Sequence, residues 1–166
     1  SVGFEKLGLN RGDRVTLQVN KSVEVIFIYL ACLRSGLIFH PLNTAYKDSE
    51  LQFFLNDAEP AVFICESTTF NKISDLNLQK KPANLFTLDS IQKLKIYEDH
   101  EILDCPDDEV AALLYSSGTT GNPKGIMLTH QNIGSNSKTL SECWNFQEDD
   151  CLLHALPIYH VHGLFV

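Results

Sequence analysis

Short apolar runs alternate with longer segments of mixed polarity along this chain. The apolar runs predict strands at residues 13–19, 38–42, 61–65, 85–88, 110–114, 126–128 and 151–156. The longer segments predict helices at residues 23–35, 48–56, 68–76 and 131–144. Residues 89–109 are polar with little periodicity, and we expect a surface connector there. This alternation indicates an α/β fold with a largely parallel sheet flanked by helices.

The helix expected over residues 23–35 is apolar nearly all round. Ser22 precedes it as a suitable N-cap, and Gly36 follows it as a residue type that commonly ends helices. Because a helix without a polar face needs apolar partners on all sides, we expect this one to be buried. Thr129 is expected to cap the helix over residues 131–144.

The charge balance excludes some classes of partner. The 166 residues include 13 basic and 21 acidic side chains, which give a formal net charge of −8. We therefore expect no nucleic-acid partner, and an anionic substrate would need a local positive site. No apolar run reaches the roughly 18 residues of a membrane span, so no membrane-spanning segment is expected.

The five cysteines form no C-x-x-C pair, and their number is odd. Cys32 and Cys65 lie in apolar segments, where a free thiol packs as a small hydrophobic group. The pattern indicates a reducing intracellular compartment, with the cytoplasm expected first and the mitochondrial matrix also compatible. A catalytic or metal-binding role is the alternative to free structural thiols.

The segment Tyr115–Gly125 holds four serine or threonine residues, three glycines and one lysine in eleven positions. Glycines allow a tight turn whose backbone N–H groups can surround an anion. The hydroxyls add hydrogen-bond donors, and Lys124 adds a positive charge suited to phosphate. We therefore expect this segment, which lies between two predicted strands, to bind a nucleoside triphosphate.

Two common nucleotide-binding motifs do not match this segment. Walker A requires G-x-x-x-x-G-K-[ST], whereas Gly118 is followed here by Gly121 and Lys124 by Gly125. The G-x-G-x-x-G pattern of dinucleotide-binding folds is also missing from it. Because a strand follows the segment, phosphate binding would depend on backbone N–H groups, hydroxyls and Lys124. A Ser/Thr/Gly-rich surface loop is the alternative that composition leaves open.

The ordered string Tyr-Ser-Ser-Gly-Thr-Thr-Gly-Asn-Pro-Lys-Gly resembles the signature loop of the adenylate-forming superfamily. This superfamily includes acyl-CoA synthetases, peptide-synthetase adenylation domains and luciferases. Three other segments resemble its N-terminal core, namely Gly12–Val15, Gly36–Pro41 and Glu50–Ala58. Leu156–Phe165 resembles its acyl-site motif. Within the superfamily, malonyl-CoA synthetases are the most similar branch, through Pro41–Tyr46, Asp57–Pro60 and His154–Gly163.

The resemblance covers the whole chain but under half of a complete enzyme. We therefore expect residues 1–166 to form a single partial domain, a portion of the large N-terminal AMP-binding domain. The start of that domain and the C-terminal domain are expected to lie outside this chain, and residues 1–166 are expected to be inactive alone.

The resemblance implies that the complete protein activates a carboxylate with ATP. In this family the carboxylate attacks the α-phosphate, which gives an acyl adenylate and pyrophosphate, and the thiol of coenzyme A then displaces AMP. Positioning and charge stabilisation dominate catalysis of such a step. Lys124 is expected to be catalytic. The residues expected to hold the outer phosphates of ATP are Ser116, Ser117, Gly118, Thr119, Thr120, Gly121, Lys124 and Gly125.

Tyr159, His160 and His162 are expected to bind the substrate, because they lie in the segment that resembles the acyl site. His160 resembles the family histidine near the carboxylate and the α-phosphate, and it is the second expected catalytic residue. The alternatives are a metal pair of His160 and His162, which lacks an evident third ligand, and packing within a strand. Mg²⁺ is expected to bridge the phosphates through a carboxylate outside this chain, so no metal ligand is assigned within it.

Malonate is the acid that the resemblance implies, with malonyl-CoA, AMP and pyrophosphate as products. One malonate carboxylate is activated, and the other needs a positive partner, which we expect to be an arginine outside this chain. The alternatives are another acyl-CoA or aryl-CoA ligase, or a non-catalytic nucleotide-binding protein.

Overall fold

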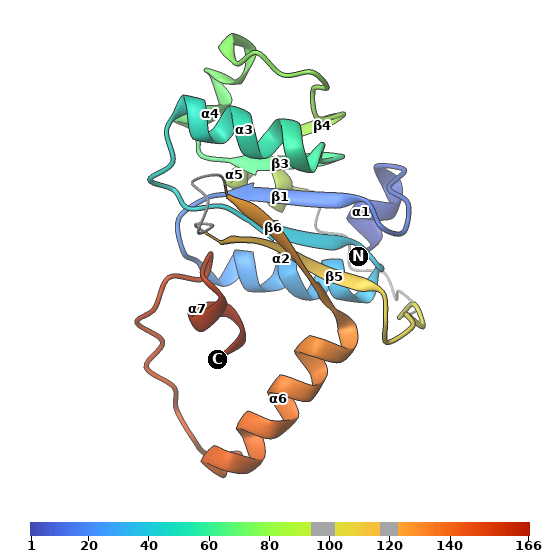
Figure 1. The fold of residues 1–166 in the computed structure, drawn as a ribbon, viewed down its shortest axis with the longest axis vertical. Helices are drawn as coiled ribbons and strands as arrows, with labels where there is room; N and C mark the ends of the chain where they lie inside the picture. The colour runs from blue at the N-terminus through green and yellow to red at the C-terminus, as the bar shows by residue number, and fades with distance from the viewer. Residues whose placement is uncertain (94–101, 117–122) are drawn as a thin grey trace.

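The fold is a mostly parallel sheet with helices on both faces, as predicted (Figure 1). The structure, a computed structural model, describes residues 1–93, 102–116 and 123–166. Its strands are β1 Arg14–Gln18, β2 Ile38–Pro41, β3 Val62–Cys65, β4 Asn84–Thr87, β5 Val110–Ser116 and β6 Lys124–Thr129. Within these ranges, the six strands form one sheet in the order β4-β3-β1-β2-β5-β6. Neighbouring strands are parallel except for β5 and β6, which pair antiparallel.

Helices cover both faces of this sheet, with α2 on one face and α3 on the other (Figure 1). The helical segments are α1 Val2–Lys6, α2 Val23–Arg34, α3 Asp48–Ala58, α4 Ser67–Phe70, η1 Ile73–Asp75, α5 Leu88–Gln92, α6 His130–Trp144 and α7 Val161–Phe165. Along β3, Val62 and Ile64 join the core that includes α2 side chains, whereas Phe63 and Cys65 join the core around α3. Burial on both faces explains why this strand is a continuous apolar run.

Two predicted helix ends are confirmed by local geometry. Gly36, just after α2, has a φ of 63°, which a glycine adopts without the steric cost that other residues carry. At the start of α6, the Thr129 hydroxyl accepts a hydrogen bond from the Asn132 backbone N–H at 3.2 Å. Such a cap satisfies one of the free N–H groups in the first helical turn.

The prediction that α2 is buried on every side is wrong. Val25, Ile28 and Cys32 are buried against the sheet, but Val23 and Phe27 on its other side are 61% and 57% exposed. The helix α2 therefore carries apolar side chains on all sides, but among the described residues only one of its faces is buried. A helix that is apolar on all sides can therefore have one face that the described residues leave exposed.

The strand predicted at residues 151–156 is also wrong. This segment has no regular structure, and Leu152 and Leu153 are 72% and 92% exposed. A strand needs a neighbour for its backbone groups, and none of the described strands lies beside this segment.

Two further predictions hold only in part. The helix predicted at 68–76 is split into α4 and the short 3₁₀ helix η1, and the expected connector at 89–109 begins within α5. Residues 94–101 of that connector lie outside the described ranges.

Candidate functional site

The glycine-rich segment connects the antiparallel strands β5 and β6, so a strand follows it as predicted. At its ends, Tyr115 pairs with Gly125 and Ser116 pairs with Lys124. Ser116 is half-buried, whereas Lys124 is exposed and free to extend toward a ligand. Residues 117–122 lie outside the described ranges. The expected phosphate contacts therefore remain predictions, including those of Ser117, Gly118, Thr119, Thr120 and Gly121.

A cavity of about 100 Å³ lies at the carboxyl ends of β2 and β5, beside the start of the glycine-rich segment. Its lining comes from the loop after β2, the end of β5 and the turn before α7: Pro41, Leu42, Asn43, Tyr46, Leu114, Tyr115, Tyr159, His160 and Val161. Ligands of parallel α/β sheets bind at this edge, outside the carboxyl ends of the strands. The structure thus brings Tyr159 and His160 to the cavity, while His162 is not among its lining residues.

A tight turn presents Tyr159 and His160 to this cavity. Its first part is anchored by Ile158, which is only 5% exposed and belongs to the core on the α2 side of the sheet. The His160 N–H then donates to the Pro157 carbonyl at 3.3 Å. A Cβ atom at Gly163 would lie 2.2 Å from the same carbonyl oxygen, so the turn requires glycine at this position.

The turn also excludes one of the alternatives for the two histidines. His160 is the N-cap of α7, and His162 lies within that helix, so packing in a strand is excluded for both residues. Within the described residues, no group of three His, Cys, Asp or Glu side chains is arranged to hold a metal ion.

Two residues that sequence reasoning left without a role hold this segment in place. The Lys21 ammonium donates to the backbone carbonyls of His154 and Leu156, the second at 2.9 Å. The His154 Nε2 atom lies 2.6 Å from the Gly163 carbonyl oxygen. Because Lys21 follows β1, it holds the segment before Tyr159 at the carboxyl ends of the strands, where the cavity lies. No local pattern in the sequence indicates this contact.

His40, which precedes the cavity-lining residue Pro41 in β2, is fully buried. Its Nδ1 atom lies 2.8 Å from the Thr16 hydroxyl, and its Nε2 atom has no hydrogen-bond partner among the described residues. Burial, with a smaller contribution from the Arg14 charge, lowers the pKa of His40 to about 3. The imidazole is therefore neutral at physiological pH, and its ring lies 5.4 Å from that of Tyr115 between centroids.

Tyr115 connects the cavity to α3, a contact that sequence reasoning missed although the residue lies in the glycine-rich motif. Its hydroxyl donates a hydrogen bond to the Asp57 carboxylate. Burial first, and this hydrogen bond second, raise the pKa of Tyr115 well above its usual value. The phenol therefore stays protonated and acts as a donor.

Gln18 fixes the loop that forms another wall of the cavity. Its side chain is only 3% exposed, and its amide nitrogen donates to the carbonyls of Asn43 and Tyr46, each at 3.2 Å. The buried Gln18 amide at the end of β1 thus satisfies two backbone carbonyls of the loop after β2. This contact too joins residues from separate elements.

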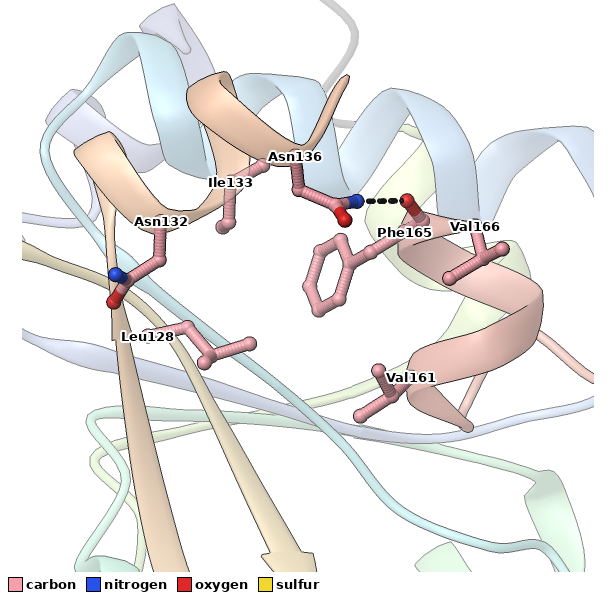
Figure 2. A pocket seen from close by; sticks show the side chains of 7 residues that line it. All are labelled: Leu128, Asn132, Ile133, Asn136, Val161, Phe165 and Val166. Atoms are coloured by element: carbon pink, nitrogen blue, oxygen red, sulfur yellow. Dashed lines mark hydrogen bonds between the residues drawn. The ribbon is translucent and has the colours of Figure 1, made fainter. Parts of the chain in front are cut away.

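A second cavity, of about 190 Å³, lies between β6, α6 and α7 (Figure 2). Its lining is mainly apolar: Leu128, Asn132, Ile133, Asn136, Val161, Phe165 and Val166. The Asn136 amide donates to the Phe165 carbonyl at 2.7 Å, which connects α6 to the end of α7 (Figure 2). Val161 lines both cavities, so the start of α7 lies between them.

The chain is similar to known proteins over nearly its whole length. The family model of AMP-binding enzymes matches residues 1–166. An oxalate–CoA ligase of Arabidopsis thaliana is 31% identical over 168 residues, which cover 95% of this chain and 32% of that protein. A mitochondrial malonate–CoA ligase of Xenopus laevis is 32% identical over 164 residues, which cover 93% of this chain and 28% of that protein.

A solved structure is also similar to this chain in sequence and fold. The ATP-bound MatB structure from Rhodopseudomonas palustris is 42% identical, with a TM-score of 0.85, over 98% of this chain and 33% of that chain. This chain therefore spans about a third of the length of the relatives it matches. None of the helices in the described ranges is long and apolar enough to cross a membrane.

Proposed function

Because the chain belongs to the AMP-binding enzyme family, we propose that its protein activates a carboxylate with ATP and then transfers the acyl group to coenzyme A. One observation carries this proposal. The cavity at the carboxyl ends of β2 and β5 places Tyr159 and His160 beside Tyr115, where the glycine-rich segment starts. A carboxylate held at His160 would thus lie close to a nucleotide whose outer phosphates are bound by that segment.

We propose that residues 1–166 are a portion of the N-terminal AMP-binding domain of a longer protein. The support is the length of the relatives, of which this chain spans about a third. In this proposal the activity belongs to the longer protein, and residues 1–166 alone do not turn over. Its compartment is proposed to be intracellular, the cytoplasm first, with one mitochondrial relative keeping the matrix as the alternative.

The residues have distinct roles in the proposed first step. The phosphate-binding residues stabilise the charge on the departing pyrophosphate. They are Ser116, Ser117, Gly118, Thr119, Thr120, Gly121, Lys124 and Gly125. His160 donates a hydrogen bond near the α-phosphate, and Tyr159 forms the adjacent wall of the cavity. Bound Mg²⁺ would neutralise phosphate charge in this step, and no ligand for it is assigned among the described residues.

Malonate is the acid we propose. Relatives named malonate–CoA ligase are 32% and 29% identical. Oxalate and 4-coumarate are the competing acids, because ligases named for them are 31% and 30% identical.

The test is acid-dependent AMP release by the full-length protein with coenzyme A. We expect the highest kcat/KM with malonate, and lower values with oxalate, acetate, 4-coumarate and a long-chain fatty acid. Equal or better use of another acid contradicts malonate while leaving the ligase activity intact. ATP binding without pyrophosphate exchange for any acid contradicts the ligase activity and favours a non-catalytic nucleotide-binding protein.

A further inference from the structure

We propose that Tyr115 and Asp57 are positioning residues that set the orientation of Ser116 and Lys124 for ATP, an inference that rests on the proposed function. Neither residue was expected to have a role in the site. Their hydrogen bond joins the end of β5 to the last turn of α3 across 58 positions of sequence. It therefore connects the base of the glycine-rich segment to an element outside that segment.

The Tyr115 ring lies against the opposite strand at the base of the segment. Gly125 is the cross-strand partner of Tyr115, and a Cβ atom at Gly125 would lie 3.5 Å from the tyrosine Cε1 and 3.7 Å from its Cζ. The ring therefore packs on β6 at Gly125. The next pair along the two strands is Ser116 with Lys124, so fixing the Tyr115 side chain fixes the strand backbone from which both residues extend.

The helix at the other end of the hydrogen bond is well fixed. In α3, Leu55 is fully buried, and Phe54 packs edge-on against Tyr115 with ring centroids 4.7 Å apart. Asp57 itself is exposed, so its carboxylate contributes a hydrogen bond rather than packing. Phe54 thus packs against the Tyr115 ring, and the hydrogen bond to Asp57 fixes the position of its hydroxyl.

This arrangement predicts an effect on ATP and not on coenzyme A. Tyr115→Phe keeps the ring but removes the hydroxyl, and Asp57→Ala removes the acceptor. Each change should raise the KM for ATP about fivefold to twentyfold, as for loss of a charge-assisted hydrogen bond at a partly exposed position. The KM for coenzyme A and the melting temperature should stay close to the wild-type values.

The experiment measures these constants in the full-length protein, together with amide exchange at Lys124 and Gly125 without nucleotide. Asp57→Asn, which keeps an acceptor oxygen, should restore most of the ATP affinity that Asp57→Ala loses. The double variant should match either single variant, because both remove the same bond. Tyr29→Phe deletes the same atom on the opposite face of the sheet and should change neither measurement.

The outcomes separate this inference from the proposed function. A wild-type protein without acid-dependent AMP release contradicts the proposed function, and the amide exchange then still tests the positioning. Unchanged exchange at Lys124 and Gly125 in Tyr115→Phe and Asp57→Ala overturns the inference. Effects on ATP that multiply in the double variant, or that appear equally in the KM for coenzyme A, also overturn it.

Discussion

The two faces of the sheet differ at its centre. On the α2 side, β1 and β2 contribute Val15, Leu17 and Phe39 to an apolar core. On the α3 side, the intervening positions are Thr16, Gln18 and His40, which are buried just as deeply. Burying polar groups costs free energy unless they form hydrogen bonds. At the centre of the sheet, the α2 face therefore contributes apolar packing, while the α3 face combines burial with hydrogen bonds beside the cavity.

The largest effect on stability is expected from the apolar face. Phe39→Ala should lower the free energy of unfolding by about 3–5 kcal/mol, because it removes a fully buried ring and leaves a cavity. Denaturant unfolding of the full-length protein measures this value. Activity per folded molecule should stay near wild type, and a specific loss of catalysis would show that the two faces do not have separate tasks.

Lys124→Ala should have the largest effect on the proposed chemistry. We expect adenylation to slow by about 10²–10³, roughly 2.7–4 kcal/mol, as for removal of one preorganised donor. Thioester formation from preformed acyl adenylate should change far less, since no pyrophosphate leaves in that step. Equal losses in both half-reactions would contradict the phosphate role of Lys124. Its exposure predicts an unchanged free energy of unfolding.

Acid should weaken the polar face selectively through His40. Its pKa is about 3 in the folded protein and about 6.5 in an unfolded chain, so the unfolded state binds more protons between these values. Stability from the neutral imidazole is complete above about pH 6.5 and declines by about 1.4 kcal/mol per pH unit below it.

Comparison of two variants isolates this contribution. His40→Leu should show a shallower fall in unfolding free energy between pH 6.5 and 4.5, whereas Phe39→Leu should keep the wild-type slope. Identical slopes in all three proteins would mean that His40 does not titrate in this range.

The smallest effect is expected at Gln18. Gln18→Leu keeps the side-chain volume but releases the carbonyls of Asn43 and Tyr46, which border the cavity. We expect the KM for the carboxylate to rise about tenfold and unfolding free energy to change by about 1 kcal/mol. The matched variant on the apolar face, Leu17→Ile, should leave the KM unchanged.

The sequence predicts the elements whose causes are local. The apolar run of β3, the Thr129 cap and the glycine after α2 each act within a few residues. The strand predicted at 151–156 and the buried α2 were wrong because both depend on what packs beside them. Local patterns do not contain that information.

The same division holds in the candidate site. The glycine-rich segment and the Tyr159–His160 motif are contiguous strings, and they could be found by inspection. The contacts that support them were missed, because Thr16 and His40 are 24 positions apart, Tyr115 and Asp57 are 58 apart, and Lys21 and His154 are 133 apart. Such pairs arise only when the fold brings distant segments of the chain together.

The turn at Gly163 gives a rule for interpreting natural variation in this chain. Any side chain there would meet the Pro157 carbonyl, so an inherited missense change at this position should disrupt the presentation of His160. Gly134, in α6, has open space around it, and replacement by alanine should be silent or favour the helix. Substitutions at these two glycines should therefore differ in effect: those at Gly163 should be damaging, and those at Gly134 should be tolerated.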